Sequence, residues 1–412
     1  MHITSYQDVL ARLDTLGMFH MDLRLERMER GLGALGLLAP PYAVAQVLGT
    51  NGKGSTASFL ASLGKIHGVK TGLFTSPHLL SPRERIRIDG KSLSEERWVE
   101  LARRVLPTAP ELTYFECICL MAVLAFAEEG VRLAVMEAGL GGRCDATSAL
   151  PAAVTCFTPV GYDHMDVLGG SLRDIAQDKA AAMRKNTPAI TVRQEPEVLA
   201  CLLEAGDRIE CPLSRAEENR AIPRDWKLGL RGAHQLENAG LALAAWKVLA
   251  QRCGWPVHEA EVRAGLETAF IAGRLQSIPA SRALPDILLD GAHNAHALAA
   301  LREALRDLDI QPRAVIFSCL ANKDLAGMAP LALDFAKGAP LFIPPIAVTQ
   351  RFAPPERIAA AFGAAARAMP SLEAALEAVG RSRASPQSPI LLCGSLYLLA
   401  EFFTLYPEYI RG

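Results

Sequence analysis

Several features that mark other classes of protein are missing from this sequence. Its 412 residues carry 43 Lys and Arg against 44 Asp and Glu, so neither sign of charge is in excess. Balanced charge argues against a nucleic-acid coat and against a polybasic membrane binder. Charge, Gly or Pro interrupts every apolar run before the roughly 20 residues that a membrane helix needs. Residues 1–16 lack the basic-then-apolar order of a signal peptide. We therefore expect a cytoplasmic protein that binds neither nucleic acid nor a membrane.

A disulfide framework is also missing. The nine cysteines are odd in number and scattered, and no CxxC pair occurs. In a large chain this usage predicts reduced and mostly buried thiols. We do not expect zinc to bind at Cys117, Cys119 and a distant His, or at His293 and His296. Both sets lack further ligands nearby.

What the sequence does contain is an alternation of short β-rich apolar runs with longer amphipathic or Ala-rich runs. Such alternation predicts an α/β fold, with parallel strands and helices on the faces of the sheet. The expected strands are 43–48, 71–75, 133–137, 153–158, 188–192, 286–289, 314–318, 341–343 and 390–393. The expected helices are 55–67, 93–105, 115–129, 171–184, 235–252, 295–308, 325–337, 356–366 and 372–379.

The length favours more than one domain, because a single hydrophobic core rarely extends beyond roughly 250–300 residues. A small, flexible Ala272-Gly273 pair ends the first series of elements, and a new series of strands follows it. We therefore predict one domain over 1–273 and a second over 274–412, with a single larger sheet as the alternative. The stretch 381–389, which contains Pro, Ser and Arg, is expected to be a surface loop before the last strand.

The first chemical signal is a Gly-rich loop at 49–56, between an expected strand and an expected helix. Its glycines let backbone N–H groups approach phosphate oxygens, and Lys53 would reach the β- and γ-phosphates of a nucleotide. Ser55 and Thr56 could cap the helix or help to bind phosphate and metal. The spacing differs from the common G-x-x-x-x-G-K-[ST] form, because Gly54 stands between Lys53 and Ser55. An ordinary Gly-rich turn with an exposed Lys is the alternative, which the strand–loop–helix context disfavours.

Polar residues also follow two further expected strands. Glu137 ends one of them, and ligands gather beyond the carboxyl ends of parallel strands, so Glu137 is a natural Mg²⁺ ligand. An ion pair with Arg143 is the alternative. His164, after the next strand, could bind metal, act as a base or cap a turn. Lys179 lies on an Ala-rich helix, where a single Lys is usually exposed to solvent.

Seven motifs then occur in a fixed order along the chain. This ordered set resembles the bacterial folylpolyglutamate synthase/dihydrofolate synthase family, a branch of the Mur ligase superfamily, from about Met21 to the last strand. The resemblance implies a P-loop, Mur-ligase-like ATPase domain with a central, mostly parallel sheet, and a smaller Rossmann-like, glutamate-ligase domain at the C-terminus. The motifs are 49–55, 75–79, 113–116, 139–147, 163–164 with 168–169, 178–180 and 290–294.

In that family, ATP converts a substrate carboxylate into an acyl phosphate, and the amine of L-glutamate then displaces phosphate. The resemblance implies ATP and two Mg²⁺ ions as cofactors, and a carbamylated Lys179 as an oxygen ligand for a metal. It also implies a role for His293 close to the glutamate or the reacting groups. The implied nucleotide contacts are Asn51, Gly52, Lys53, Gly54, Ser55, Asn238, Arg274 and Asp290. The implied metal ligands are Ser76 and Glu137 for one ion, and His164 and Lys179 for the other.

The implied substrates are 7,8-dihydropteroate, reduced folates and L-glutamate. An aromatic ring can stack on a flat pterin, and a carboxylate can pair with its amino-pyrimidine edge. The implied substrate contacts are Asp22, Leu23, Phe115, Glu116, Cys144, Asp145 and Ala146.

The resemblance favours a monomeric enzyme with both dihydrofolate synthase and folylpolyglutamate synthase activity. A Mur-type ligase for another carboxylate is the nearest rival. A nucleotide-binding regulator that does not ligate is the alternative from another class, although it would not need Glu137, His164 and Lys179. Four residues differ from those usual in the family, namely Ser148, Asp178, Ala272 and Cys144. These differences affect the fit of the pterin and the stiffness of the linker.

Overall fold

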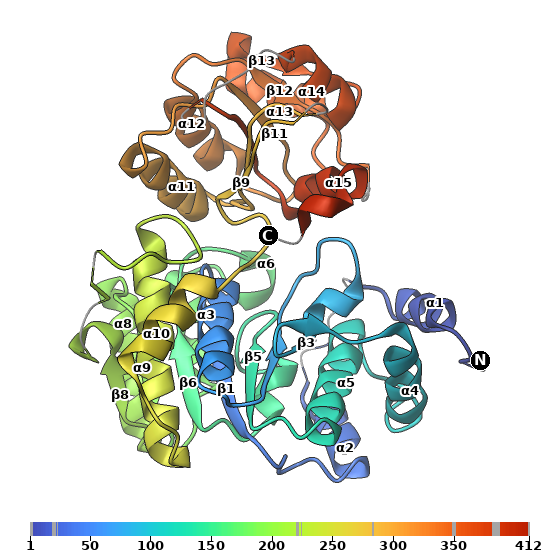
Figure 1. The fold of residues 1–412 in the computed structure, drawn as a ribbon, viewed down its shortest axis with the longest axis vertical. Coiled ribbons are helices and arrows are strands. Elements are labelled where there is room, and N and C mark those ends of the chain that lie inside the picture. The colour runs from blue at the N-terminus through green and yellow to red at the C-terminus, as the bar shows by residue number, and fades with distance from the viewer. Residues whose placement is uncertain are drawn as a thin grey trace. The chain divides into compact units, whose positions relative to one another are not determined.

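The computed structural model describes residues 3–18, 22, 24–219, 222–223, 225–281, 284–347, 352–380 and 388–410. The chain forms two compact units, which we call the first and the second unit (Figure 1). The first comprises Met1–Gly229 and Leu236–Ala269, and the second comprises Leu230–Gln235 and Phe270–Gly412. Leu23 and most of the expected loop at 381–389 lie outside the described residues.

The first unit is built on an eight-stranded sheet with the order β4-β3-β2-β5-β1-β6-β7-β8. Strands β2, β5, β1, β6, β7 and β8 are parallel, whereas β3 and β4 are added antiparallel at one edge. Every residue of β2, β5 and β6 is buried, as is usual where helices cover both faces of a parallel sheet. The bounds are β1 Ala43–Leu48, β2 Thr71–Phe74, β3 Ile86–Ile88, β4 Lys91–Ser92, β5 Leu133–Glu137, β6 Val154–Phe157, β7 Ala189–Thr191 and β8 Leu213–Arg215.

Helices cover both faces of this sheet. A Cβ atom on Gly72 of β2 would meet Phe126 of α5, whereas its neighbour Thr71 lies against Gly64 of α3. Because neighbouring residues of a strand point to opposite faces, α3 and α5 lie on opposite sides of the sheet. The bounds are α1 Tyr6–Leu16, α2 Glu26–Ala34, α3 Lys53–Ile66, α4 Glu95–Val105, α5 Tyr114–Glu128, α6 Met165–Leu168, α7 Leu172–Ala180, α8 Pro196–Ile209, α9 His234–Cys253 and α10 Glu259–Thr268.

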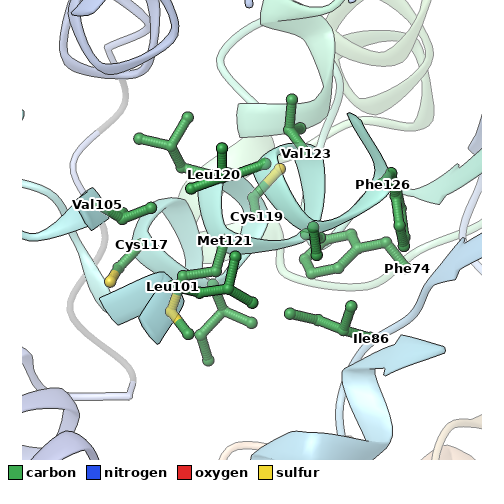
Figure 2. Packing of buried hydrophobic residues seen from close by; sticks show 14 of the residues in the cluster. Phe74, Ile86, Leu101, Val105, Cys117, Cys119, Leu120, Met121, Val123 and Phe126 are labelled. Atoms are coloured by element: carbon green, nitrogen blue, oxygen red, sulfur yellow. The ribbon is translucent and has the colours of Figure 1, made fainter. Parts of the chain in front are cut away.

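The core on the α5 side joins α4 and α5 to strands β2 and β3 (Figure 2). Phe74 and Ile86 of the sheet pack in this core with Phe126 of α5, and all three side chains are fully buried. Cys117 and Cys119 of α5 are buried in the same core. All nine cysteines are free thiols and most are buried, and no zinc-like cluster occurs among the described residues.

The second unit has a six-stranded sheet with the order β13-β12-β11-β14-β10-β9. All neighbouring strands are parallel except β9, which pairs antiparallel with β10. No helix in the described part of the chain combines the length and apolar character required to cross a membrane. The bounds are β9 Gln276–Ile278, β10 Ile287–Leu289, β11 Ala314–Phe317, β12 Leu341–Ile343, β13 Ala366–Ala368, β14 Ile390–Cys393, α11 Ala295–Asp307, α12 Leu325–Ala336, α13 Pro355–Phe362, α14 Leu372–Val379 and α15 Leu396–Leu405.

Two α/β units with mostly parallel sheets confirm the predicted fold class. The expected strands all occur, and 43–48, 133–137, 341–343 and 390–393 have the bounds predicted. The short strands β3, β4, β8, β9 and β13, which flank the central strands, were not predicted. The helix expected over 171–184 ends at Ala180, and residues 181–182 form a turn after it.

Candidate active site

The Gly-rich loop follows β1 and turns into α3 at Gly52, which has a left-handed φ of 88°. The Nζ of Lys53 donates hydrogen bonds to the carbonyl oxygens of Gly49 (3.2 Å) and Thr50 (3.0 Å). The backbone N–H of Thr50 in turn donates to the carbonyl oxygen of Pro159 (2.8 Å), beyond the end of β6. The loop is therefore a fixed cradle, with the lysine side chain folded back over it.

Gly49 is expected to tolerate no side chain. Its φ is 138°, and a Cβ atom there would overlap Thr158 Oγ1 and lie 2.8 Å from the Thr158 carbonyl oxygen. We expect Gly49→Ala to lower the free energy of unfolding of the first unit by about 1–3 kcal/mol, the usual cost of overpacking. Urea unfolding followed by tryptophan fluorescence measures this unit, because the chain's 4 Trp, at 98, 226, 246 and 255, all belong to it.

Gly36→Ala is the matched control for this substitution. Gly36 also has a positive φ, 69°, but nothing lies within 4 Å of the position that its Cβ would take. The control therefore measures the strain of a left-handed backbone without the overlap. Equal losses of stability in the two variants would contradict the close approach at Gly49.

Asn238 of α9 lies against the same loop. It is buried, and its Oδ1 accepts a hydrogen bond from Thr56 Oγ1 at 3.4 Å. A Cβ atom on Gly52 would overlap this amide. Asn238 is therefore not an amide on the helix surface, and it lies directly beside the Gly-rich loop.

Glu137 and Ser76 meet at the carboxyl ends of β5 and β2. The backbone N–H of Ser76 donates to Glu137 Oε2 at 2.8 Å, and the position of a Cβ on Gly54 would lie 3.4 Å from Glu137 Oε1. Glu137 is 3% exposed. The alternative ion pair with Arg143 does not form, because Arg143 is largely exposed and faces Asp178 at 3.9 Å instead.

Lys179 is buried, with 4% of its surface exposed, so the expectation of a solvent-facing lysine is wrong. A Cβ atom on Gly142 would lie 2.7 Å from Lys179 Cα, so α7 packs directly on the 139–147 loop. Burial, followed by the nearby charge of Lys53, lowers the pKa of Lys179 from 10.5 to about 7. A buried amine with such a pKa is neutral in a large share of molecules at neutral pH.

His164 precedes the short helix α6 and has a left-handed φ of 52°. Its backbone N–H donates to Asp163 Oδ1 at 3.0 Å, and its side chain is exposed. Among the described residues, no three His, Cys, Asp or Glu side chains gather in a way that could hold a metal ion.

His78, in the Thr-Ser-Pro-His-Leu motif, has a fixed orientation. Arg85 Nε donates to His78 Nδ1 at 2.9 Å, which leaves the ring proton on Nε2. Burial, together with the charge of Arg85, lowers the pKa of His78 to about 3, so the ring is neutral. Glu84 holds the same loop by accepting from the backbone N–H groups of residues 79–81 at 2.7–2.8 Å.

The expected substrate residues Asp22 and Glu116 are joined by an arginine that the sequence did not single out. Arg27 of α2 donates to both Glu116 carboxylate oxygens and to Asp22. Nothing in the local pattern distinguishes Arg27 from Arg24 and Arg30, because only its long-range partner at the start of α5 makes it special.

Phe115 lies beside Glu116 at the start of α5. Its ring centroid is 5.5 Å from that of Phe74, and its edge would be 2.7 Å from a Cβ atom on Gly139. The missing side chain at Gly139 therefore lets the ring cover the start of the 139–147 loop. Thr113 caps α5 and so fixes where the helix that carries this ring begins.

Asp145 organises the 139–147 loop. Its Oδ2 accepts from the N–H groups of Gly139 (2.8 Å) and Leu140 (3.1 Å), and its Oδ1 accepts from the N–H (2.9 Å) and hydroxyl (2.6 Å) of Thr147. Burial raises the pKa of Asp145, and these hydrogen bonds act in the opposite direction. Of its neighbours, Cys144 is half-buried and Ala146 is buried.

In the second unit, Asp290 follows β10 and is buried. Its carboxylate accepts from the N–H groups of Leu275 (3.0 Å) and Ala292 (2.9 Å). A Cβ atom on Gly291 would lie 2.5 Å from Arg274 Nη1, so glycine leaves room for that guanidinium. Within this unit, Arg274 and Asp290 therefore lie close together.

His293 Nδ1 lies 2.8 Å from the carbonyl oxygen of Gly291. Because a carbonyl oxygen only accepts, Nδ1 carries a proton, and Nε2 is the nitrogen that can take up another. Asn294 then caps α11, which follows directly. Asp290 and His293 thus occupy one short segment between β10 and α11.

Comparison with protein families finds two matching models. The Mur ligase middle domain matches residues 47–209, and the Mur ligase glutamate ligase domain matches residues 273–396. The two matches fall in the first and the second unit respectively.

Individual relatives found by sequence comparison belong to the same ligase family. A Bacillus subtilis dihydrofolate synthase/folylpolyglutamate synthase is 30% identical over 79% of this chain and 82% of its own length. The Escherichia coli protein of the same description is 35% identical over 77% of each chain. An Arabidopsis thaliana folylpolyglutamate synthase is 38% identical over 62% of this chain, which spans only 49% of that longer relative.

Solved structures match along the whole chain. Escherichia coli FolC in complex with DHPP and ADP has a TM-score of 0.86 and 29% identity, and covers 98% of both chains. The bifunctional Yersinia pestis protein complexed with AMPPNP and a Mn ion has a TM-score of 0.84 and 27% identity, and covers 98% of both chains. The chain therefore belongs to the dihydrofolate synthase/folylpolyglutamate synthase family of ATP-dependent Mur-type ligases.

Proposed function

We propose that this chain adds L-glutamate to 7,8-dihydropteroate and to reduced folates, with release of ADP and phosphate. The observation that carries the proposal is the gathering of Lys53, Glu137 and Lys179 in the first unit. The lysine cradle, the buried carboxylate and the buried amine belong to elements that are far apart in the sequence. The proposal includes a monomeric, cytoplasmic enzyme.

In this proposal the nucleotide binds through its phosphates to the loop of Asn51, Gly52, Lys53, Gly54 and Ser55. Lys53 neutralises charge on the transferred phosphoryl group, and the fixed loop supplies the positioning on which phosphoryl transfer depends. Asn238 contacts the nucleotide from α9. Arg274 reaches the phosphates, and Asp290 reaches the ribose.

Mg²⁺ is the metal that this donor set fits. Glu137 and Ser76 offer a carboxylate and a hydroxyl within one hydrogen-bonded pair of segments, and hard cations prefer oxygen ligands. His164 and a carbamylated Lys179 would hold the second ion. Bound Mg²⁺ neutralises the charge that keeps a carboxylate and a polyphosphate apart.

The chemistry itself proceeds in two displacements. The substrate carboxylate oxygen attacks the γ-phosphorus of ATP, and ADP leaves. The L-glutamate nitrogen then attacks the acyl carbon, the amide bond forms and phosphate leaves. His293 lies in the segment proposed to face these groups, and its Nε2 would accept a proton from the attacking amine.

The test offers ATP, Mg²⁺ and L-glutamate with 7,8-dihydropteroate or with tetrahydrofolate, and follows products by mass spectrometry beside phosphate release. Glutamylation of both acceptors is the expected result. Glutamylation of only one would assign that activity alone. Nucleotide binding without glutamylation of either would contradict the proposal and favour a Mur-type ligase for another carboxylate or a nucleotide-binding regulator.

Asp145→Ala is expected to impair use of the pterin more than use of ATP. The substitution leaves the donors on Gly139, Leu140 and Thr147 without their acceptor, at about 1–3 kcal/mol for each group that stays buried. The loop that carries Cys144 and Ala146 should then lose its shape. We expect the KM for 7,8-dihydropteroate to rise about tenfold, equivalent to about 1.4 kcal/mol, with little change in the KM for ATP.

The matched control is Arg143→Ala, on the same loop. Arg143 is exposed and makes only a long ion pair with Asp178, so both KM values should stay unchanged. If Asp145→Ala raised the two KM values equally, Asp145 would have a general structural role instead.

A further inference from the structure

Arg27 lies between two carboxylates in the interior of the first unit. Its side chain is 5% exposed and that of Glu116 is 6% exposed. Arg27 Nε and Nη2 donate to Glu116 Oε2 (3.2 Å) and Oε1 (2.9 Å), so the pair is bidentate. Arg27 Nη1 donates to Asp22 Oδ2 (2.5 Å), and Nη2 also donates to the Asp22 carbonyl oxygen (2.9 Å). One guanidinium thus ties the segment before α2 to the start of α5.

These hydrogen bonds limit the capacity of Glu116 to bind a substrate directly. Both of its oxygens accept from Arg27, and Oε2 also accepts from the N–H of Thr113 at 2.7 Å. A buried carboxylate engaged in this way has little capacity left to pair with the edge of a substrate. Glu116 therefore acts on Arg27, and through Thr113 on the start of α5.

Asp22 is the more accessible of the two acids. Its side chain is 29% exposed, and hydrogen bonds from Arg24 and Arg27 lower its pKa to about 2, so it is ionised. We call the group of Arg27, Asp22 and Glu116 the clamp. At its other end, Phe115 lies two residues after the Thr113 cap, with its ring against Gly139. The clamp thus holds an ionised carboxylate and an aromatic ring, the two groups suited to the edge and the face of a flat heterocycle.

Burying an ion pair costs desolvation that its attraction often fails to recover, and apolar residues of similar size are frequently more stable in its place. A core that keeps Arg27 and Glu116 is therefore not built for stability alone. A bidentate arginine fixes geometry in a way that a point charge cannot.

We propose that Arg27 is a positioning residue for the pterin ring, acting through Asp22 and through Glu116 at the start of α5. This inference rests on the proposed function, since it names the part of that site that sets affinity for the acceptor. In this proposal Arg27 acts only through the two acids that it binds, Asp22 and Glu116.

The test compares Arg27→Met with Arg30→Met. Arg30 lies on the same helix, one turn on, and makes only an exposed ion pair with Glu111. We expect Arg27→Met to raise the KM for 7,8-dihydropteroate about tenfold or more, with kcat and the KM for ATP within about twofold of the parent. Arg30→Met should match the parent in all three. Arg27→Lys keeps the charge but loses the fork, and should remain impaired.

A double variant, Arg27→Met with Glu116→Gln, separates positioning from stability. It removes the unpaired buried carboxylate that Arg27→Met leaves behind, so its thermal midpoint should recover towards the parent. The KM for 7,8-dihydropteroate should stay high. Recovery of KM together with stability would overturn the positioning role, as would an unchanged KM in Arg27→Met.

The activity of the parent enzyme separates a failure of this inference from a failure of the proposed function. If the parent glutamylates neither acceptor, the proposed function fails. If it glutamylates 7,8-dihydropteroate with full activity and Arg27→Met has the same KM, only the role of Arg27 fails.

Discussion

Lys53→Ala is expected to lower turnover by about 10²-fold or more, the usual effect of removing one preorganised group that stabilises developing charge. Lys53 Nζ is held on the carbonyl oxygens of Gly49 and Thr50, so its charge is already in place before a nucleotide arrives. Steady-state phosphate release and product formation measure the loss.

Lys65→Ala is the control, since Lys65 lies in the last turn of the same helix and is exposed. It should have the turnover of the parent. A Lys53→Ala enzyme that also kept the parental rate would refute the phosphate role of the loop. A loss confined to the KM for ATP would mean that Lys53 binds the nucleotide equally in its ground and transition states.

Lys179→Ala is expected to be the second severe loss, of about 10²-fold in turnover by the same reasoning on charge. Carbamylation requires the neutral amine, and burial with the charge of Lys53 provides it by lowering the pKa of Lys179 to about 7. A short carboxylic acid such as acetate should restore part of the activity, because it supplies the missing oxygen ligand.

Lys185→Ala is the matched control for this loss. Lys185 lies just beyond α7 and makes an exposed ion pair with Glu210, so neither the loss nor the rescue should occur. In the parent, activation by bicarbonate should weaken as the pH falls below about 7, because protonation then removes the reactive amine. Full activity of Lys179→Ala would refute the carbamate.

The central strands could be predicted because they are fully buried and nearly all apolar. Strands 133–137 and 390–393 are such runs, and the structure begins and ends them where the sequence does. The edge strands could not be predicted in this way. Lys91–Ser92 and Ala366–Ala368 have only two or three residues each and are strands only because a neighbour pairs with them.

The site residues likewise fall into those that local sequence order predicts and those that it does not. The Gly-rich loop and Glu137 follow from local order along the chain, since a strand, a turn and a helix place them. The burial of Lys179 does not, because it depends on how closely α7 packs on Gly142. Arg27 could not be found either, because its partner Glu116 is 89 residues away in the sequence.

The clamp of Arg27 and Glu116 also restricts how the chain can change over evolutionary time. Loss of Arg27 alone leaves the buried Glu116 carboxylate without its cation, and loss of Glu116 alone leaves the buried Arg27 with only the more exposed Asp22. Either state is usually less stable than the intact pair or than two apolar residues. Substitutions at the two positions are therefore coupled. Any evolutionary route from the ion pair to a pair of apolar residues passes through a less stable intermediate protein. Descendants should keep both residues or have replaced both, which makes positions 27 and 116 a covarying pair among homologous chains.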